Sequence, residues 1–129
     1  MKFSITQNGK KLSKRKYNWD ENTKILSTNE NNLVLNFSNY NGVTFNTGSD
    51  CTFDTGHSCT FTCGEKCVCI RRDIYEVIEI PENKTIKLNK YEIKGYSFQL
   101  QKRKIVIDGK EIEMSEESYQ NLKKSLINP

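Results

Sequence analysis

The sequence predicts a mainly β fold: a short β-solenoid (β-helix) of octapeptide repeats, with β caps at both ends and one C-terminal α-helix. Three observations predict it. Residues 43–70 divide into the eight-residue units VTFNTGSD, CTFDTGHS, CTFTCGEK and the looser CVCIRRDI. Short segments in which apolar and polar residues alternate flank this repeat on both sides. Helical spacing of apolar residues appears only after residue 115. A repeat of fixed period indicates stacked units that bury a shared core.

Each octad contains a three-residue apolar–polar–apolar run, which is the pattern of a half-buried strand. The inward positions predict a core made of Phe37, Phe45, Phe53, Phe61, Cys51, Cys59, Cys67 and Cys69. Glycine occupies the sixth position of the three clearest units, as Gly48, Gly56 and Gly64. We expect glycine to supply a backbone angle that other residues resist, and therefore to mark a corner.

Two octads per coil would place successive units on opposite walls. One wall would then hold Leu35/Phe37, Cys51/Phe53 and Cys67/Cys69, and the other Val43/Phe45, Cys59/Phe61 and Tyr75/Val77. Three octads per coil and an antiparallel meander with tight glycine turns are the alternatives. The solenoid is favoured because meanders seldom repeat one residue type at the same position of successive strands.

The run CTFDTGHSCTFTCGEKCVCIRRDIYEVIE resembles octapeptide-repeat small proteins encoded by bacteriophages and prophages. The resemblance covers about residues 36–95 and is most specific in the CTFxTGxx units and in Arg71-Arg72-Asp73. Cys63 departs from the pattern, because threonine is usual at its position. The resemblance implies a viral or mobile-element origin and no particular activity.

The segments around the repeat predict three parts of one compact domain: an N-terminal β cap (1–34), the octapeptide-repeat solenoid (35–80), and a C-terminal β segment with a helix (81–129). Asn8-Gly9 and Asp108-Gly109 are typical of tight β-hairpins. Ser115 is an expected N-cap for the helix, because Tyr119, Leu122 and Leu126 follow it at helical spacing.

Composition limits the classes of function. The chain has 129 residues, 35% hydrophobic residues and a formal net charge of +4, and its mean hydropathy is −0.73. The charge argues against an acidic mimic of nucleic acid. No apolar run approaches the ~20 residues needed to span a bilayer, and the N-terminus lacks the apolar region of a signal peptide. We expect a cytoplasmic protein without a membrane partner, in the host cytosol if phage-encoded.

The cysteines raise the question of a metal site. Cys59, Cys63, Cys67 and Cys69 lie close together in sequence, near the single histidine, His57. Zinc sites usually have paired Cys-x2–4-Cys knuckles on turns, whereas three of these cysteines already have a role at repeat positions. We therefore expect reduced, inert packing and neither metal nor cofactor, with zinc or a Cys–Cys crosslink as alternatives.

Two groups of basic residues are candidate partner-binding residues. The first is Lys14, Arg15 and Lys16, preceded by Lys10 and Lys11 and followed by Trp19; such cations with aromatics suit phosphates and bases. The second is Arg71 and Arg72, which interrupt the repeat where arginines at an exposed rung would bind carboxylate or phosphate on a partner. Alternatively, these two arginines simply end the regular stack.

Catalysis has little support in the sequence, because no phosphate loop, nucleophile elbow or paired-carboxylate motif appears. The threonine ladders, Thr44 and Thr60 on one wall and Thr52 on the other, are too small for an ice-binding array. The sequence therefore favours a non-enzymatic protein-binding module. If phage-encoded, it would act on a host protein, for example as an inhibitor of a bacterial defence system such as an anti-CRISPR. The alternatives are a nucleic-acid-binding accessory protein that uses the basic N-terminal hairpin, and a structural component of a virion or other assembly that forms homo-oligomers.

Overall fold

The chain is mainly β in a computed structural model, which describes residues 3–99, 102–107 and 109–115. Two compact units are formed, Met1–Phe98 and Gln99–Pro129. The first unit contains two six-stranded sheets, and the second contains a two-stranded hairpin. All side chains considered below belong to the first unit.

Sheet 1 of the first unit has the strand order β10-β9-β7-β5-β1-β2. Its strands are β1 (Ser4–Gln7), β2 (Lys10–Lys11), β5 (Leu33–Phe37), β7 (Thr52–Thr55), β9 (Cys67–Arg71) and β10 (Glu76–Ile80). Sheet 2 has the order β12-β11-β8-β6-β4-β3. Its strands are β3 (Asn18–Asp20), β4 (Ile25–Ser27), β6 (Thr44–Asn46), β8 (Thr60–Thr62), β11 (Thr85–Leu88) and β12 (Tyr96–Phe98). A 3-10 turn, η1 (Lys14–Lys16), joins β2 to β3.

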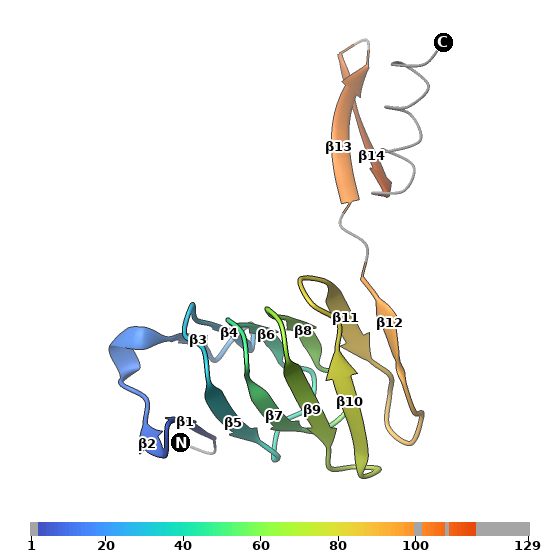
Figure 1. The fold of residues 1–129 in the computed structure, drawn as a ribbon. Helices are drawn as coiled ribbons and strands as arrows, with labels where there is room; N and C mark the ends of the chain where they lie inside the picture. The colour runs from blue at the N-terminus through green and yellow to red at the C-terminus, as the bar shows by residue number, and fades with distance from the viewer. Residues whose placement is uncertain (1–2, 100–101, 108, 116–129) are drawn as a thin grey trace. The chain divides into compact units, whose positions relative to one another are not determined.

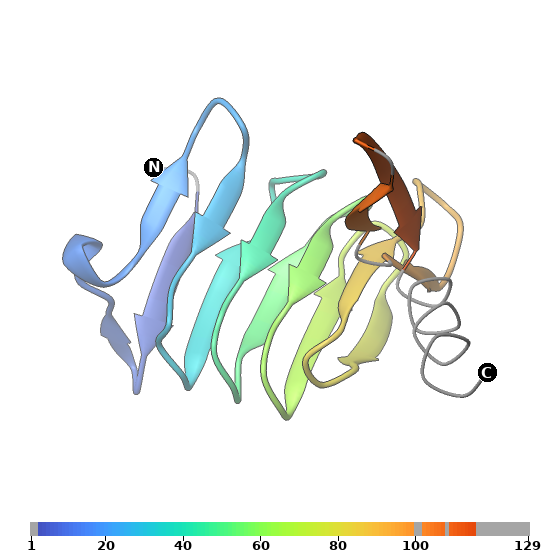
Figure 2. The same cartoon turned by 90° about the horizontal axis from the view of Figure 1, so that it is seen from above.

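The central strands of both sheets are parallel, and consecutive octads lie in opposite sheets (Figures 1 and 2). Thr44 pairs with Thr60 in sheet 2, and Thr52 pairs with Val68 in sheet 1, each pair being two octads apart. The prediction that successive octads lie on opposite walls is therefore confirmed. The outer strands pair antiparallel: β1 and β10 in sheet 1, β3 and β11 in sheet 2.

The core between the sheets is a phenylalanine column, made of Phe37, Phe45, Phe53 and Phe61. Each of these rings is fully buried. The Phe45 and Phe61 rings are stacked with centroids 5.1 Å apart and planes 7° from parallel, and Phe53 lies 4.8 Å from Phe61 at 66°. The four cysteines predicted to join this core, Cys51, Cys59, Cys67 and Cys69, are also buried. Aromatic contacts of this kind add to the free energy gained from burial alone.

The first rung of the repeat differs from the predicted register. Leu35 pairs with Phe53 and Phe37 with Thr55, so Leu33 lies opposite Cys51, the place expected for Leu35. The turn from Ser38 to Gly42 contains two more residues than an octad corner allows, which shifts the preceding strand by two positions. A shift of two leaves every side chain on its own face, and the alternation of burial is preserved.

The end of the repeat also differs from the prediction. Tyr75 and Val77 were expected on the same inner wall as Phe45, but β10 belongs to sheet 1 and runs antiparallel to β9. Ile78 and Ile80 point inward from β10, whereas Tyr75 and Val77 are 81% and 67% exposed. A tight turn with Tyr75 at a φ of 52° reverses the chain before it reaches the opposite sheet.

The glycines of the octads have a different role from the one predicted. Gly48, Gly56 and Gly64 do not have positive φ; a Cβ atom on each would overlap a side chain of the preceding corner, Asn31, Asn41 and Ser49 in turn. The left-handed residue is instead the eighth of each unit. Gly42, Asp50, Ser58 and Lys66 occupy that position with φ between 57° and 67°. Glycine at the sixth position therefore lets successive corners approach closely.

The hairpin predictions are confirmed at both ends of the chain. Asn8 and Gly9 both have positive φ between the antiparallel strands β1 and β2, as a type I′ turn requires. In the second unit, β13 (Lys102–Ile107) pairs antiparallel with β14 (Lys110–Ser115). Ser115 ends β14, and the helix predicted after it lies outside the described residues.

We expect Gly56→Ala to lower the free energy of unfolding by roughly 2 kcal/mol, because the added methyl group would overlap Asn41 and the Tyr40 carbonyl oxygen. Lys66→Gly, one corner further along, should raise stability by roughly 0.5–1 kcal/mol, since Lys66 is exposed with a φ of 58°. Urea denaturation of both variants measures the two effects. Equal changes in the free energy of unfolding would contradict the assignment of close approach to the sixth octad position and of positive φ to the eighth.

Candidate functional site

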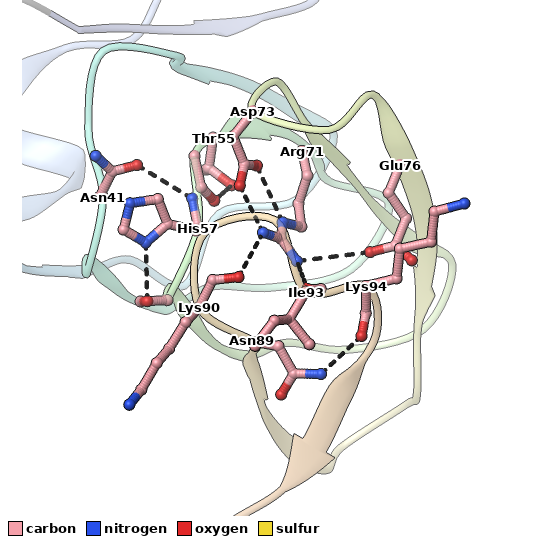
Figure 3. Close-up of polar contacts among 12 residues, drawn as sticks. Asn41, Thr55, His57, Arg71, Asp73, Glu76, Asn89, Lys90, Ile93 and Lys94 are labelled. Atoms are coloured by element: carbon pink, nitrogen blue, oxygen red, sulfur yellow. Dashed lines mark hydrogen bonds and ion pairs between the residues drawn. The ribbon is translucent and has the colours of Figure 1, made fainter.

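Arg71 lies at the end of the core farthest from the N-terminus, and its side chain is fully buried (Figure 3). It is the last residue of β9 and pairs with Thr55 of β7, which in turn pairs with Phe37 of β5. Arg71 therefore points into the core along the same row as a buried phenylalanine. The expectation that Arg71 presents an exposed charge to a partner is contradicted by this burial.

The guanidinium of Arg71 is surrounded by acceptors. Its Nε and Nη2 donate to the two carboxylate oxygens of Asp73 at 3.1 and 2.6 Å. Nη1 donates to the Ile93 carbonyl oxygen at 2.6 Å, and Nη2 also donates to the Lys90 carbonyl oxygen at 3.2 Å. Glu76 lies 3.8 Å from Nη1 and accepts a hydrogen bond from the Gly95 backbone N–H. Arg71 thus ties the loop of residues 89–95 over the end of the core.

The charge of Asp73 is maintained by this contact. Burial favours the protonated carboxyl, but the hydrogen bonds and positive charge of Arg71 outweigh burial and lower the pKa of Asp73 below its usual 3.8. A buried charge is tolerated only when it is paired and hydrogen-bonded, and Arg71 meets both conditions. Arg71, Asp73 and Glu76 are therefore well suited to closing the core.

Arg72 points the other way, toward solvent, and remains available to a partner. Its guanidinium binds the Asp54 carboxylate through Nε at 2.8 Å and Nη2 at 2.6 Å, and its side chain is 53% exposed. The pair fixes the orientation of Arg72 on the outer side of sheet 1. Only one of the two predicted arginines therefore lies at the surface.

The outer faces of the two sheets differ in chemistry. The residues of sheet 1 that alternate with its buried residues include Val34, Val68, Ile70 and Val77, and among these Val34 is 53% and Val77 67% exposed. Sheet 2 presents Asn18, Asp20, Ile25, Ser27, Thr44, Asn46, Thr60, Thr62, Thr85 and Lys87. Ile25 is the one aliphatic residue in that outward set, whereas sheet 1 has four, which lie among the polar residues Ser4, Thr6, Asn36, Thr52, Asp54 and Glu79. Further exposed apolar side chains, Tyr91, Ile93, Tyr96 and Phe98, lie on the loop of residues 89–95 and on β12.

These outward aliphatic residues were missed by the sequence analysis. The signal was present, since Val68 and Ile70 occupy octad positions that carry Thr, Asn or Asp in the preceding units. An aliphatic residue at a position that is polar in the preceding units adds apolar area to the outer face of the sheet.

The basic residues of segment 10–16 are exposed, whereas Leu12 between them is buried in the core. Lys16 has one nearby acid, Glu30, at 3.7 Å between exposed atoms, which is a weak pair. Of the aromatic residues that follow, Tyr17 and Trp19 both pack against the buried ring of Phe3. The segment therefore offers cations for phosphates, while its aromatic rings contribute to the core.

The cysteines fall into two groups that differ from the predicted set. Cys51 and Cys67 both lie near the Gly48 carbonyl oxygen, at 3.8 and 3.5 Å, and Cys63 interacts with Cys67. Cys69 lies 3.4 Å from the Thr55 hydroxyl, and burial raises the pKa of Cys69 to about 12. All five thiols are free and buried. Among the described residues, no group of three or more His, Cys, Asp or Glu side chains is arranged to hold a metal ion.

His57 lies at the corner next to Arg71 (Figure 3). Its Nδ1 lies 2.9 Å from the Ser58 hydroxyl, its backbone N–H donates to the Asn41 side chain at 3.1 Å, and its ring contacts Tyr91. These contacts connect neighbouring corners of the first unit, which gives His57 a positioning role in the fold.

No family model, curated protein or solved structure matches this chain. Within residues 3–99, 102–107 and 109–115, no helix has the length and apolar character needed to cross a bilayer.

We expect Arg71→Met to lower the free energy of unfolding by about 3 kcal/mol or more, because Asp73 and the carbonyl oxygens of the 89–95 loop lose their buried partner. Arg72→Gln is the matched control, and we expect it to have little effect because Arg72 lies in solvent. Denaturant unfolding compares the two variants. An equal decrease in the free energy of unfolding for both variants would show that Arg71 does not close the core.

The same variant should change the titration of Asp73. In the parent chain the pKa of Asp73 is lowered, so its contribution to stability is present above pH 3.8 and is lost as the pH falls through the folded-state pKa. Without Arg71, burial is opposed only by the backbone hydrogen bond at Asp73 and by His57, so the pKa of Asp73 should rise relative to the parent chain. Carboxyl-carbon NMR titration measures this shift directly.

Proposed function

We propose that this chain is a non-enzymatic protein-binding module that contacts its partner through the outer face of sheet 1. The observation that carries the proposal is the difference between the two outer faces: sheet 1 has four outward aliphatic residues, Val34, Val68, Ile70 and Val77, and sheet 2 has one, Ile25. A sheet face exposed only to water is normally polar, as the outer face of sheet 2 is. The Arg72–Asp54 pair adds a fixed polar contact beside Ile70.

The outer face of sheet 1 is smaller than the area that a stable protein interface buries on each partner. Its six strands hold 25 residues, which at ~3.3 Å per residue and ~4.8 Å between strands cover roughly 400 Å². A stable interface buries about 800 Å² on each partner. We infer that the partner also contacts the rim of the sheet, where Tyr75 is 81% exposed on one side and the basic segment begins on the other.

We further infer that the first unit is a short β-solenoid of two octads per coil. The parallel, in-register pairing of β5, β7 and β9, and of β4, β6 and β8, supports this description. The rigidity of such a stack suits protein recognition, because an interface held in one conformation loses little conformational entropy on binding.

The resemblance of the octads to small proteins of bacteriophages and prophages leads us to propose a host protein as the partner, in the cytosol of a bacterial cell. Inhibition of a bacterial defence system, as by an anti-CRISPR, is the proposed consequence. Binding alone would be sufficient for such a role, since occupying a partner's surface requires no chemistry from the chain.

We expect Ile70→Thr combined with Val77→Thr to weaken binding of the captured host protein at least tenfold, because both aliphatic contacts are lost while β-branching is kept. The matched control is Ile25→Thr, an outward isoleucine on sheet 2 that is 37% exposed. Capture from host lysate identifies the partner, and titration with the purified partner measures the affinity. Unchanged affinity in the double variant would overturn the proposed face, and loss in Ile25→Thr alone would place binding on sheet 2.

Nucleic-acid binding is the second candidate, favoured by the exposed cations of residues 10–16. We expect it to be mainly electrostatic, because Tyr17 and Trp19 are half-buried against Phe3. Neutralising Lys14, Arg15 and Lys16 to glutamine should then reduce the slope of log K against log salt by about 0.7 per lost phosphate contact on single-stranded DNA. Fluorescence anisotropy over a salt series measures the slope, and a parent chain without salt-dependent binding would exclude this candidate.

A further inference from the structure

A pocket of about 490 Å³ opens at the N-terminal end of the first unit. It lies between the turn that follows β3 and the turn that follows β5. Pockets of 300–1,000 Å³ that combine aromatic walls with a few polar groups are typical of small-ligand sites. The pocket involves none of the outward aliphatic residues of sheet 1, so the inference below is independent of the proposed function.

Three aromatic rings form the apolar part of the pocket: Phe3, Trp19 and Tyr40. The Phe3 and Trp19 centroids are 5.3 Å apart at 63°, and the Trp19 and Tyr40 centroids 5.8 Å apart at 80°. Phe3 is buried, whereas Trp19 and Tyr40 are half-buried. Part of the Trp19 and Tyr40 rings is therefore accessible to a ligand, on a base fixed by the core.

The indole of Trp19 is held in place by a hydrogen bond from its Nε1–H to Glu21 Oε2 at 2.7 Å. The bond satisfies the indole donor and leaves Glu21 Oε1 as an acceptor toward the pocket. A ring fixed before binding loses no rotational freedom when a ligand packs on it, which favours binding.

The rim of the pocket carries polar groups of both charges. Glu21 and Lys24 come from the turn after β3, and Asn39 and Asn41 from the turn after β5. The Asn41 side-chain oxygen accepts the His57 backbone N–H, which leaves its amide nitrogen as a donor. Hydrogen-bond donors and acceptors therefore surround an aromatic surface.

This combination identifies the class of ligand. Glu21 and Lys24 carry opposite charges, so a net charge on the ligand gains little, and the aromatic rings favour a ligand with an apolar face. A neutral ligand with one apolar face and several hydroxyl groups satisfies both conditions. We propose that the pocket binds a sugar ring, with the C–H face of a pyranose against Trp19 and Tyr40 and its hydroxyl groups bonded to Glu21, Lys24, Asn39 and Asn41.

Trp19 is the single tryptophan of the chain, so its fluorescence reports on the pocket directly. We expect saturable changes in emission on titration with methyl pyranosides of glucose, galactose, mannose or N-acetylglucosamine. A single ring should bind with a Kd on the order of millimolar. Saturation-transfer NMR on the same mixtures identifies which hydrogens of the sugar contact the protein.

Asn39→Ala and Lys24→Gln should each weaken binding at least threefold without changing the fold, because both side chains are exposed. Asn46→Ala, an exposed asparagine on the outer face of sheet 2, is the matched control and should bind as the parent chain does. Tyr40→Phe keeps the ring and should retain most of the affinity.

Two results would overturn the proposal. One is the absence of saturable fluorescence change and of saturation transfer across the whole pyranoside panel. The other is saturable binding that Asn39→Ala and Lys24→Gln leave unchanged. Choline and inorganic phosphate serve as charged probes, and saturation by either of them in place of the sugars would also reject the neutral-ligand assignment.

Discussion

The structure depends on phenylalanine rings that pack in register between two narrow sheets. Most strands of the first unit have only three to five residues, and a single one buries too little apolar surface to be stable. Burial of each phenylalanine contributes about 1.5–3 kcal/mol, and rings from opposite sheets share the same space. The parallel ladders hold those rings at a constant spacing. Corners, outer faces and end caps are all positioned by this column.

The two ends of the column are closed in different ways. At the N-terminal end, aromatic rings continue outward from Phe37 through Phe3 to Trp19 and Tyr40, so apolar packing reaches the surface. At the other end, Arg71 takes an inward position and binds backbone carbonyl oxygens of a covering loop. Antiparallel strands at both ends separate the parallel ladders from solvent, which limits edge-to-edge association. The aromatic end carries the pocket of about 490 Å³.

The octad period was sufficient to predict the inward phenylalanines and cysteines and the alternation between walls, and the dipeptide Asn8-Gly9 predicted the first hairpin. It was insufficient for features that depend on distant segments. The register of Leu33 depends on the length of the Ser38–Gly42 turn, which breaks the period. The burial of Arg71 depends on carbonyl oxygens about twenty residues later, and no local pattern indicates them. The glycine role was misassigned because positive φ and close approach both select glycine, and only coordinates distinguish them.

The alternation of octads between the sheets has a consequence for how such a chain can change in length. Duplication of one octad ahead of β9 would move every later segment, including Arg71 and the loop that receives it, to the opposite wall, and the outward Val68 and Ile70 would then lie on the other sheet. Duplication of two octads would add one complete rung and leave both terminal closures intact. Insertions and deletions that keep the outward aliphatic residues on one sheet should therefore occur in multiples of two units, which makes the reach of the molecule adjustable only in discrete steps.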